Sequence, residues 1–112
     1  MLTTLFLFLL AAQDDRIYKV GEDRVKAPTV VHRVEPKYSD AAREAKIDGV
    51  VVLSAVISTA GKAEKIIVLR KLEPSLDQNA ITAIEQWKFE PGTRDGVPVR
   101  VKATIELNFR RL

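Results

Sequence analysis

The chain has 112 residues, of which 46% are hydrophobic and 29% charged, so it can form one domain with one modest core. Its 18 basic and 15 acidic residues are interspersed and leave a net charge of only +3, a balance that argues against nucleic-acid binding. There is no cysteine, which excludes disulfides, thiol catalysis and thiolate metal sites.

The first twelve residues, MLTTLFLFLLAA, differ from the rest because they are apolar and carry no charged side chain. The run is too short to cross a bilayer as a helix, but its length and its small residues Ala11 and Ala12 are typical of an export signal. A buried helix and a truncated upstream anchor stay open as alternatives, since no Lys or Arg precedes the run. We expect a signal peptide over 1–12 and an exported protein.

Residues 13–35 are polar and weakly periodic, and they predict an extended lead-in with at most a short edge strand at TVVHRV, 29–34. The domain itself is expected over 36–112. It opens with PKYSDAAREAK, which predicts a short helix with Ser39 as its N-cap and with Gly49 just after its end.

A β-hairpin is predicted next. The run VVVLSAVIS from Val50 is almost entirely aliphatic and β-branched, which suits a strand that is covered on at least one face. The run is broken at TAGK, where Gly61 can adopt a positive φ, and the segment 63–70 then supplies the returning strand.

The segment EPSLDQNAITAIEQW is the clearest helix. Ser75 is its predicted N-cap, and Gln78 three residues later completes the pattern of a capping box. The apolar positions form one stripe on a 3.6-residue period, which should lie against the sheet; they are Leu76, Ala80, Ala83, Ile84 and Trp87.

The last segment, VRVKATIELNF at 99–109, alternates between apolar and polar residues along its whole length, which predicts a strand with one buried face. The order helix, hairpin, helix, strand predicts an α+β fold. In this fold a small antiparallel sheet, made of the hairpin and the C-terminal strand, carries two helices packed on one face.

The stretch AIEQWKFEPGTRDGVPV joins the second helix to the last strand and contains the only tryptophan. Because Trp87 continues the apolar stripe, its ring should pack on the sheet with Phe89 beside it, and Pro91-Gly92 and Asp95-Gly96 should turn the chain. An aromatic ligand site and a phosphate loop are the alternatives, but packing explains both rings and no Lys-Ser/Thr pair opens a helix. The predicted core residues are Tyr38, Leu76, Ala80, Ile84, Trp87, Phe89 and Phe109.

Catalytic and metal-binding patterns are weak in this sequence. His32 is the only histidine and lies in the poorly patterned lead-in, while Asp14-Asp15 and Glu22-Asp23 lack the spaced oxygen ligands of a calcium loop. We therefore expect no enzyme, no catalytic residue, no metal site and no cofactor.

Several short motifs and single residues follow one another along the chain in a fixed order: PKYSDAAR, Gly49, Gly61, LDQNA, WKFEPG, GVPV and Phe109. None is specific alone, but together, from about Pro36 to Phe109, they resemble the C-terminal domain of the TonB family of energy transducers. The sequence departs from that family at Ser39, where a proline is frequent, and at Ala60, where an acidic or turn residue is frequent.

The resemblance implies a binding module of the periplasm or cell envelope that engages TonB-box-like peptides of outer-membrane transporters by strand addition, in energy transduction or transport. A structural or scaffolding domain, homodimeric through the same sheet edge, is the alternative. Full-length members of the family carry an inner-membrane helix and a long proline-rich spacer. This sequence has five prolines and no apolar span of about 20 residues, so it resembles the receptor-binding end without that shaft.

The partner is expected at the last strand. The apolar run at 50–57 belongs in the centre of the sheet, so the hairpin return takes one side of it and the last strand is left at an edge. An edge exposes unpaired backbone groups, which are a template for an added strand. The predicted binding residues are Val99, Arg100, Val101, Lys102, Ala103, Thr104, Ile105, Glu106, Leu107 and Asn108.

Overall fold

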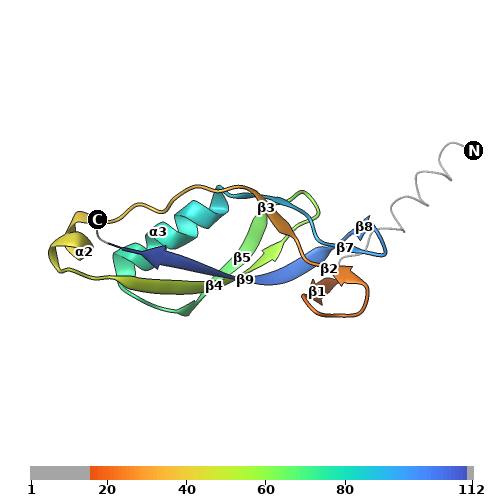
Figure 1. Cartoon of the computed structure of the whole chain (residues 1–112), viewed down its shortest axis with the longest axis horizontal. Coiled ribbons are helices and arrows are strands. Elements are labelled where there is room, and N and C mark those ends of the chain that lie inside the picture. Colours follow the sequence, from red (N-terminus) through yellow and green to blue (C-terminus); the bar gives the residue numbers. More distant parts are fainter. Residues whose placement is uncertain (1–15, 111–112) are drawn as a thin grey trace, which may run out of the picture.

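The computed structural model of the chain describes residues 16–110, so the predicted export signal lies outside the described residues. Figure 1 shows long strands crossing the molecule, with one prominent helix along them. The elements in chain order are β1 (Ile17–Lys19), β2 (Val25–Lys26), β3 (Thr29–His32), α2 (Asp40–Glu44), β4 (Gly49–Ile57), β5 (Ala63–Arg70), α3 (Pro74–Glu85), β6 (Lys88–Glu90), β7 (Thr93–Arg94), β8 (Val97–Pro98) and β9 (Arg100–Phe109).

The main sheet has the strand order β1-β9-β4-β5. Strands β4 and β9 run antiparallel in unbroken register, from Gly49 opposite Phe109 to Ile57 opposite Val101, while β5 returns antiparallel beside β4. Strand β1 pairs with the start of β9 and runs parallel to it. The predicted α+β class is therefore confirmed, but the sheet is mixed rather than purely antiparallel because the lead-in adds a parallel strand.

Two smaller sheets hold the lead-in and the joint before β9. One has the order β2-β7-β8, and the other pairs β3 with β6. The segment expected to be mainly extended thus supplies three short strands, each paired with a strand from the C-terminal third of the chain. The predicted turn at Asp95-Gly96 joins β7 to β8 with φ values of 52° and 80°, as a two-residue hairpin turn requires.

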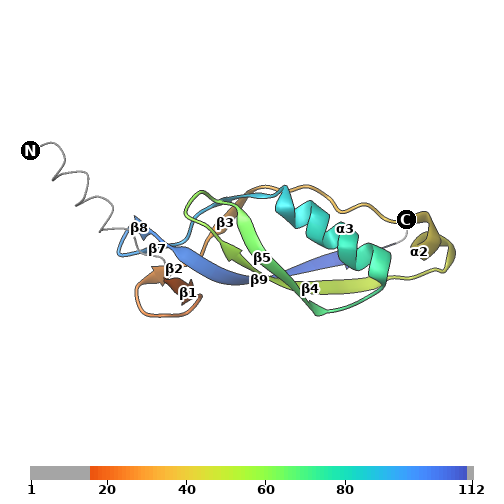
Figure 2. The same ribbon diagram turned by 180° about the vertical axis from the view of Figure 1, so that it is seen from behind.

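The core lies between α3 and the sheet, where the helix packs against β4 and β5 (Figure 2). The structure buries six of the seven predicted core residues to 8% exposure or less, while Tyr38 is half-buried and packs edge-on against Phe109 with ring centroids 5.8 Å apart. Alternate residues of β4 meet the helix stripe from the sheet side: Val51, Leu53, Ala55 and Ile57.

The two helix caps were predicted with different success. Ser39 caps α2 as predicted and accepts a hydrogen bond from the backbone N–H of Ala42 at 3.1 Å. The prediction for α3 was wrong, because its N-cap is Glu73 rather than Ser75. Pro74 occupies the first helical position, which suits proline because that N–H has no partner inside the helix.

The carboxylate of Glu73 accepts hydrogen bonds from the backbone N–H groups of Ser75 at 2.9 Å and Leu76 at 3.2 Å. The Ser75 hydroxyl donates to the same carboxylate at 2.5 Å. These bonds favour the charged form, so the Ser75 hydroxyl, followed by the Ser75 and Leu76 N–H groups, lowers the pKa of Glu73.

Candidate functional site

The structure changes the predicted edge. Strand β9 lies between β1 and β4, so its first residues, Arg100–Lys102, are already paired with Ile17–Lys19. Val99 precedes the strand, is buried, and donates its backbone N–H to the carbonyl oxygen of Gly92 at 2.9 Å. An open edge is left at 103–109, where β9 has no strand partner on the side away from β4 among residues 16–110. We call this segment the open edge.

The side chain of Tyr18 holds the lead-in strand β1 against β9. Its side chain is only 4% exposed and forms a small second cluster with Val99 and Val101. The guanidinium groups of Arg16 and Arg94 lie 4.5 Å and 5.4 Å from its ring centroid, within the range of cation–π attraction. A three-residue strand with a partner more than eighty positions away carries no periodic signal, which is why the sequence did not predict it.

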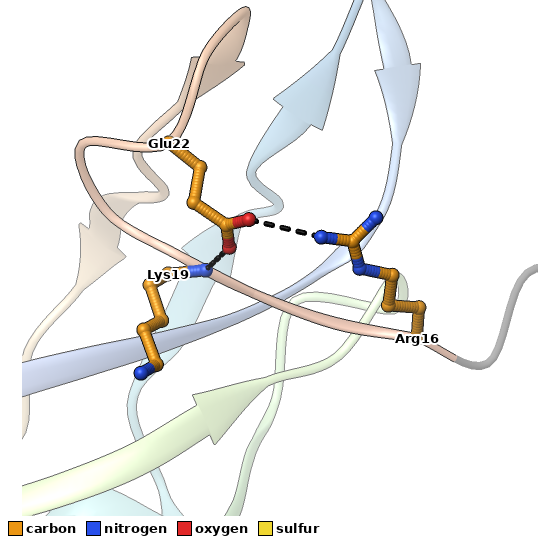
Figure 3. Close-up of polar contacts among 3 residues, drawn as sticks. All are labelled: Arg16, Lys19 and Glu22. Atoms are coloured by element: carbon orange, nitrogen blue, oxygen red, sulfur yellow. Dashed lines mark hydrogen bonds and ion pairs between the residues drawn. The ribbon is translucent and has the colours of Figure 1, made fainter.

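A carboxylate fixes the turn that ends β1 (Figure 3). Glu22 accepts a hydrogen bond from the backbone N–H of Lys19 at 2.5 Å and pairs with the Arg16 guanidinium at 3.0 Å. The chain reverses at Gly21, whose φ of 97° suits glycine. Strand β1 therefore stops at Lys19, and the open edge begins directly beyond its end.

The two faces of the open edge differ as the alternation predicted. Ala103, Ile105, Leu107 and Phe109 pack on the main core, whereas Thr104, Glu106 and Asn108 are exposed on the opposite face. All seven residues are paired one-to-one with β4. A strand added here would thus extend both the buried and the solvated face of the sheet.

Strand β5 forms the other edge of the main sheet, and it is less regular. Its pairing with β4 shifts register twice, and Lys65 has a φ of 48°. Bulges and exposed charges interrupt the row of backbone groups that an added strand needs, a common protection of edge strands. Ile67 and Leu69 of β5 are nevertheless 56% and 59% exposed.

A groove of about 590 Å³ lies at the start of the open edge. It is lined by Lys19 and Val20 at the end of β1, by the link Ala27-Pro28 between β2 and β3, and by 102–104 of β9. Sequence reasoning could not find this groove, because it depends on the way the lead-in folds onto β9.

The remaining candidate residues lie elsewhere. His32 is exposed at the end of β3, and Glu22 is used in the turn after β1. Within the described part of the chain, no group of three His, Asp or Glu side chains could hold a metal ion. Trp87 and Phe89 are buried with ring centroids 6.0 Å apart, so neither ring presents a ligand-binding surface.

None of the helices between residues 16 and 110 has the length and apolarity to cross a membrane.

Comparison with protein families then decides the affiliation. Residues 34–111 match the family described as the Gram-negative bacterial TonB protein C-terminal. The chain belongs to this family. The TonB-type match begins at residue 34, so it includes the hairpin, α3 and β9, whereas β1, β2 and β3 precede it.

Three relatives are similar to this TonB-type chain. Protein TonB of Vibrio cholerae serotype O1 is 36% identical over 86 residues, which are 76% of this chain but only 35% of that protein. The solution structure of the Pseudomonas aeruginosa TonB C-terminal domain matches with a TM-score of 0.63 and 24% identity, over 83% of this chain and 92% of that one. A TonB2 protein structure from Vibrio anguillarum matches with a TM-score of 0.51 and 27% identity, over 89% and 96%.

The chain thus spans about a third of the length of the V. cholerae relative. Its fold agrees with these two solved structures over most of each of their chains. The predicted resemblance is therefore confirmed at the level of family and fold.

Proposed function

We propose that this chain is a binding module of the cell envelope that takes part in TonB-type energy transduction. It binds a TonB-box-like peptide segment of an outer-membrane transporter as an added strand on the open edge, 103–109. Membership of the TonB C-terminal family supports the general role. The geometry of β9 supports the location of the peptide.

The observation that carries this proposal is the contrast between the two edges of the main sheet. The open edge keeps an unbroken one-to-one register with β4, so its free backbone groups form a regular row. The β5 edge is interrupted by two register shifts. A peptide strand that pairs through its backbone needs the regular row, so β9 is the better template.

The energetics predict a weak, reversible complex. Each added backbone hydrogen bond contributes about 0.5–1.5 kcal/mol net, while fixing each peptide residue costs about 1–2 kcal/mol. These contributions nearly cancel, so side-chain contacts must supply the surplus stability. A transient complex suits a device that couples repeatedly to its partner better than it suits a permanent scaffold.

Amide chemical shifts of the labelled protein, titrated with N-terminal peptides of candidate transporters, test the proposal. We expect the largest shifts at 103–109 and at the facing residues of β4. Shifts confined to β5 would show that the peptide binds the other edge of the main sheet and would contradict the proposed location. If no transporter peptide shifts any amide while light scattering shows a stable dimer, the chain is instead a scaffold that pairs with itself.

A further inference from the structure

The N-terminal ends of α2 and α3 are joined by a contact between two serine side chains. The hydroxyl oxygens of Ser39 and Ser75 lie 2.8 Å apart, although the two residues are 36 positions apart in the sequence. Ser39 is the N-cap of α2, and Ser75 lies in the first turn of α3. Both side chains are partly buried, so a hydrogen bond between them competes less with water than an exposed one would.

The direction of this hydrogen bond follows from the other partners of the two hydroxyl groups. A serine hydroxyl donates one proton and accepts through its oxygen. Ser75 gives its proton to the carboxylate of Glu73, so its oxygen accepts the proton of Ser39. The oxygen of Ser39 in turn accepts the backbone N–H of Ala42. Hydrogen bonds therefore run in one direction from α2 to the cap of α3; we call this chain of Ala42, Ser39, Ser75 and Glu73 the cap relay.

Helix α2 depends on such contacts because it is short. It has five residues, whereas isolated helices below about 12–15 residues are marginal in water. Of its five residues only Ala42 is buried, and it joins the main core. The cap relay therefore supplies one of the few tertiary contacts that hold α2 in place.

The α3 end of the cap relay is fixed without help from α2. Helix α3 has 12 residues and buries four of them. Glu73 also accepts the backbone N–H groups of Ser75 and Leu76, so its carboxylate stays in place as the cap of α3. One turn further along the helix, the Asn79 amide donates to the carbonyl oxygen of Lys37 at 2.7 Å. Helix α3 is thus the firm support, and α2 is the element whose order depends on it.

The segment around α2 covers the far end of the open edge. Tyr38 donates its hydroxyl proton to the carbonyl oxygen of Ile47 and packs its ring edge-on against Phe109. Phe109 is the last residue of β9 and lies opposite Gly49. Figure 1 shows α2 at the end of the molecule where β9 finishes, far from β1. A loosened α2 would therefore release Tyr38 and leave the last residues of the open edge less ordered.

We infer that the cap relay couples α2 to α3 and, through Tyr38 and Phe109, keeps the far end of the open edge, 107–109, ordered. Ser75 is a positioning residue in this arrangement, because it acts on the edge through Ser39 and Tyr38. Only the use of this end by a partner strand rests on the proposed function. The coupling itself is a property of the free protein.

Amide hydrogen exchange of the free protein tests the coupling in the variants Ser39→Ala, Ser75→Ala and the double variant. Ser75→Ala keeps the backbone N–H that Glu73 accepts, so α3 stays capped while the cap relay is cut. Thr82→Ala is the matched control, because it removes an exposed hydroxyl of the same helix that accepts only a 3.4 Å bond from Gln78. The reporting amides are those that donate within and just after α2: Arg43, Ala45, Lys46 and Ile47.

We expect Ser75→Ala to raise the exchange rates of these four amides, and of the protected amides at 107–109, about two- to tenfold, the range of one net hydrogen bond. The amides of β7 and β8 should not change, because local opening at that end leaves the cap relay intact. Thr82→Ala should leave the α2 rates as they are, and Ser75→Thr, which keeps the hydroxyl, should restore them. In the Ser39→Ala background, Ser75→Ala should have no further effect on α2.

Two results would overturn the inference. One is an effect of Ser75→Ala on α2 that is absent, or that is equally large with and without the Ser39 hydroxyl. The other is faster exchange in α2 with unchanged rates at 107–109. The expected rates together with no response of the open edge to any transporter peptide would support the coupling and reject the proposed function.

Discussion

The indole N–H of Trp87 donates a hydrogen bond to the carbonyl oxygen of Val34, at a distance of 2.8 Å. The bond joins the end of α3 to the segment that leads into the domain, and the ring itself is only 4% exposed. Arg33, beside Val34, places its guanidinium 4.8 Å from the centre of the same ring. Trp87 thus fastens the segment before α2 to the core.

Two substitutions of Trp87 should destabilise the domain to different extents. Trp87→Ala should lower the free energy of unfolding by about 3–5 kcal/mol, as for other buried aromatic residues. Trp87→Phe should cost less, about 1–3 kcal/mol, mainly because the Val34 carbonyl loses its partner. Urea unfolding followed by circular dichroism measures both, since the fluorescence of the only tryptophan is lost. Unchanged stability in Trp87→Ala with loss of ligand binding would instead favour an aromatic ligand site.

Two glycines with similar backbone angles allow a matched test of the contact between the hairpin tip and β6. Gly61 and Gly96 have φ values of 78° and 80°, but an added Cβ at Gly96 meets open space. At Gly61 the Cβ would lie 2.0 Å from the carbonyl oxygen of Phe89, whose N–H donates to Gly61 at 2.9 Å. Gly96→Ala should cost about 1–2 kcal/mol from the left-handed backbone alone. Gly61→Ala should lower the urea midpoint further; equal effects would show that the contact is unimportant.

Because Glu73 caps α3, part of the domain's free energy of unfolding should depend on pH. Because hydrogen bonds from Ser75 and Leu76 lower the pKa of Glu73 in the folded state, its contribution is present above the unfolded pKa and is lost as the pH falls through the folded value. Glu73→Gln should therefore be less stable than the unchanged protein at neutral pH, and the difference should shrink below about pH 4. Urea midpoints against pH measure this. Glu85→Gln, at the exposed opposite end of the helix, is the control and should show no such trend.

The apolar N-terminus leads to a prediction about processing. If 1–12 is an export signal, the mature protein is found in the envelope fraction and begins near residue 13. Cell fractionation followed by N-terminal sequencing determines both properties. A cytoplasmic product that retains Met1 would contradict the prediction.

The long elements could be predicted because their periodicity is decided locally. The alternation along 99–109 and the helical stripe that ends at Trp87 both appear in the structure, since each spans enough residues to repeat its period. The start of α3 was misplaced because the Ser75 and Gln78 pair imitates a capping box, while Pro74 moves the cap to Glu73. Glutamate is an uncommon N-cap, so propensity favoured the serine.

The candidate site was only half predictable, for a different reason. That 99–109 forms a strand follows from its own residues, but which side of it stays open depends on β1. The position of β1 in turn depends on Tyr18 meeting Val99 and Arg94, which come from a distant part of the chain, in addition to its near neighbour Arg16. Such a cluster exists only after folding, so no local pattern in 13–35 reveals it.

Disulfide trapping locates the peptide most directly, because the chain has no cysteine of its own. Single cysteines are placed at exposed sites on the two edges, as Glu106→Cys on β9 and Ile67→Cys on β5. Each is then oxidised with a transporter peptide that carries one cysteine at successive positions. Neighbouring strands lie about 4.7–4.9 Å apart, which allows a disulfide only between side chains that share a register. We predict trapping of Glu106→Cys at one peptide position and none of Ile67→Cys; trapping of Ile67→Cys alone would show that the partner binds β5 and not the open edge.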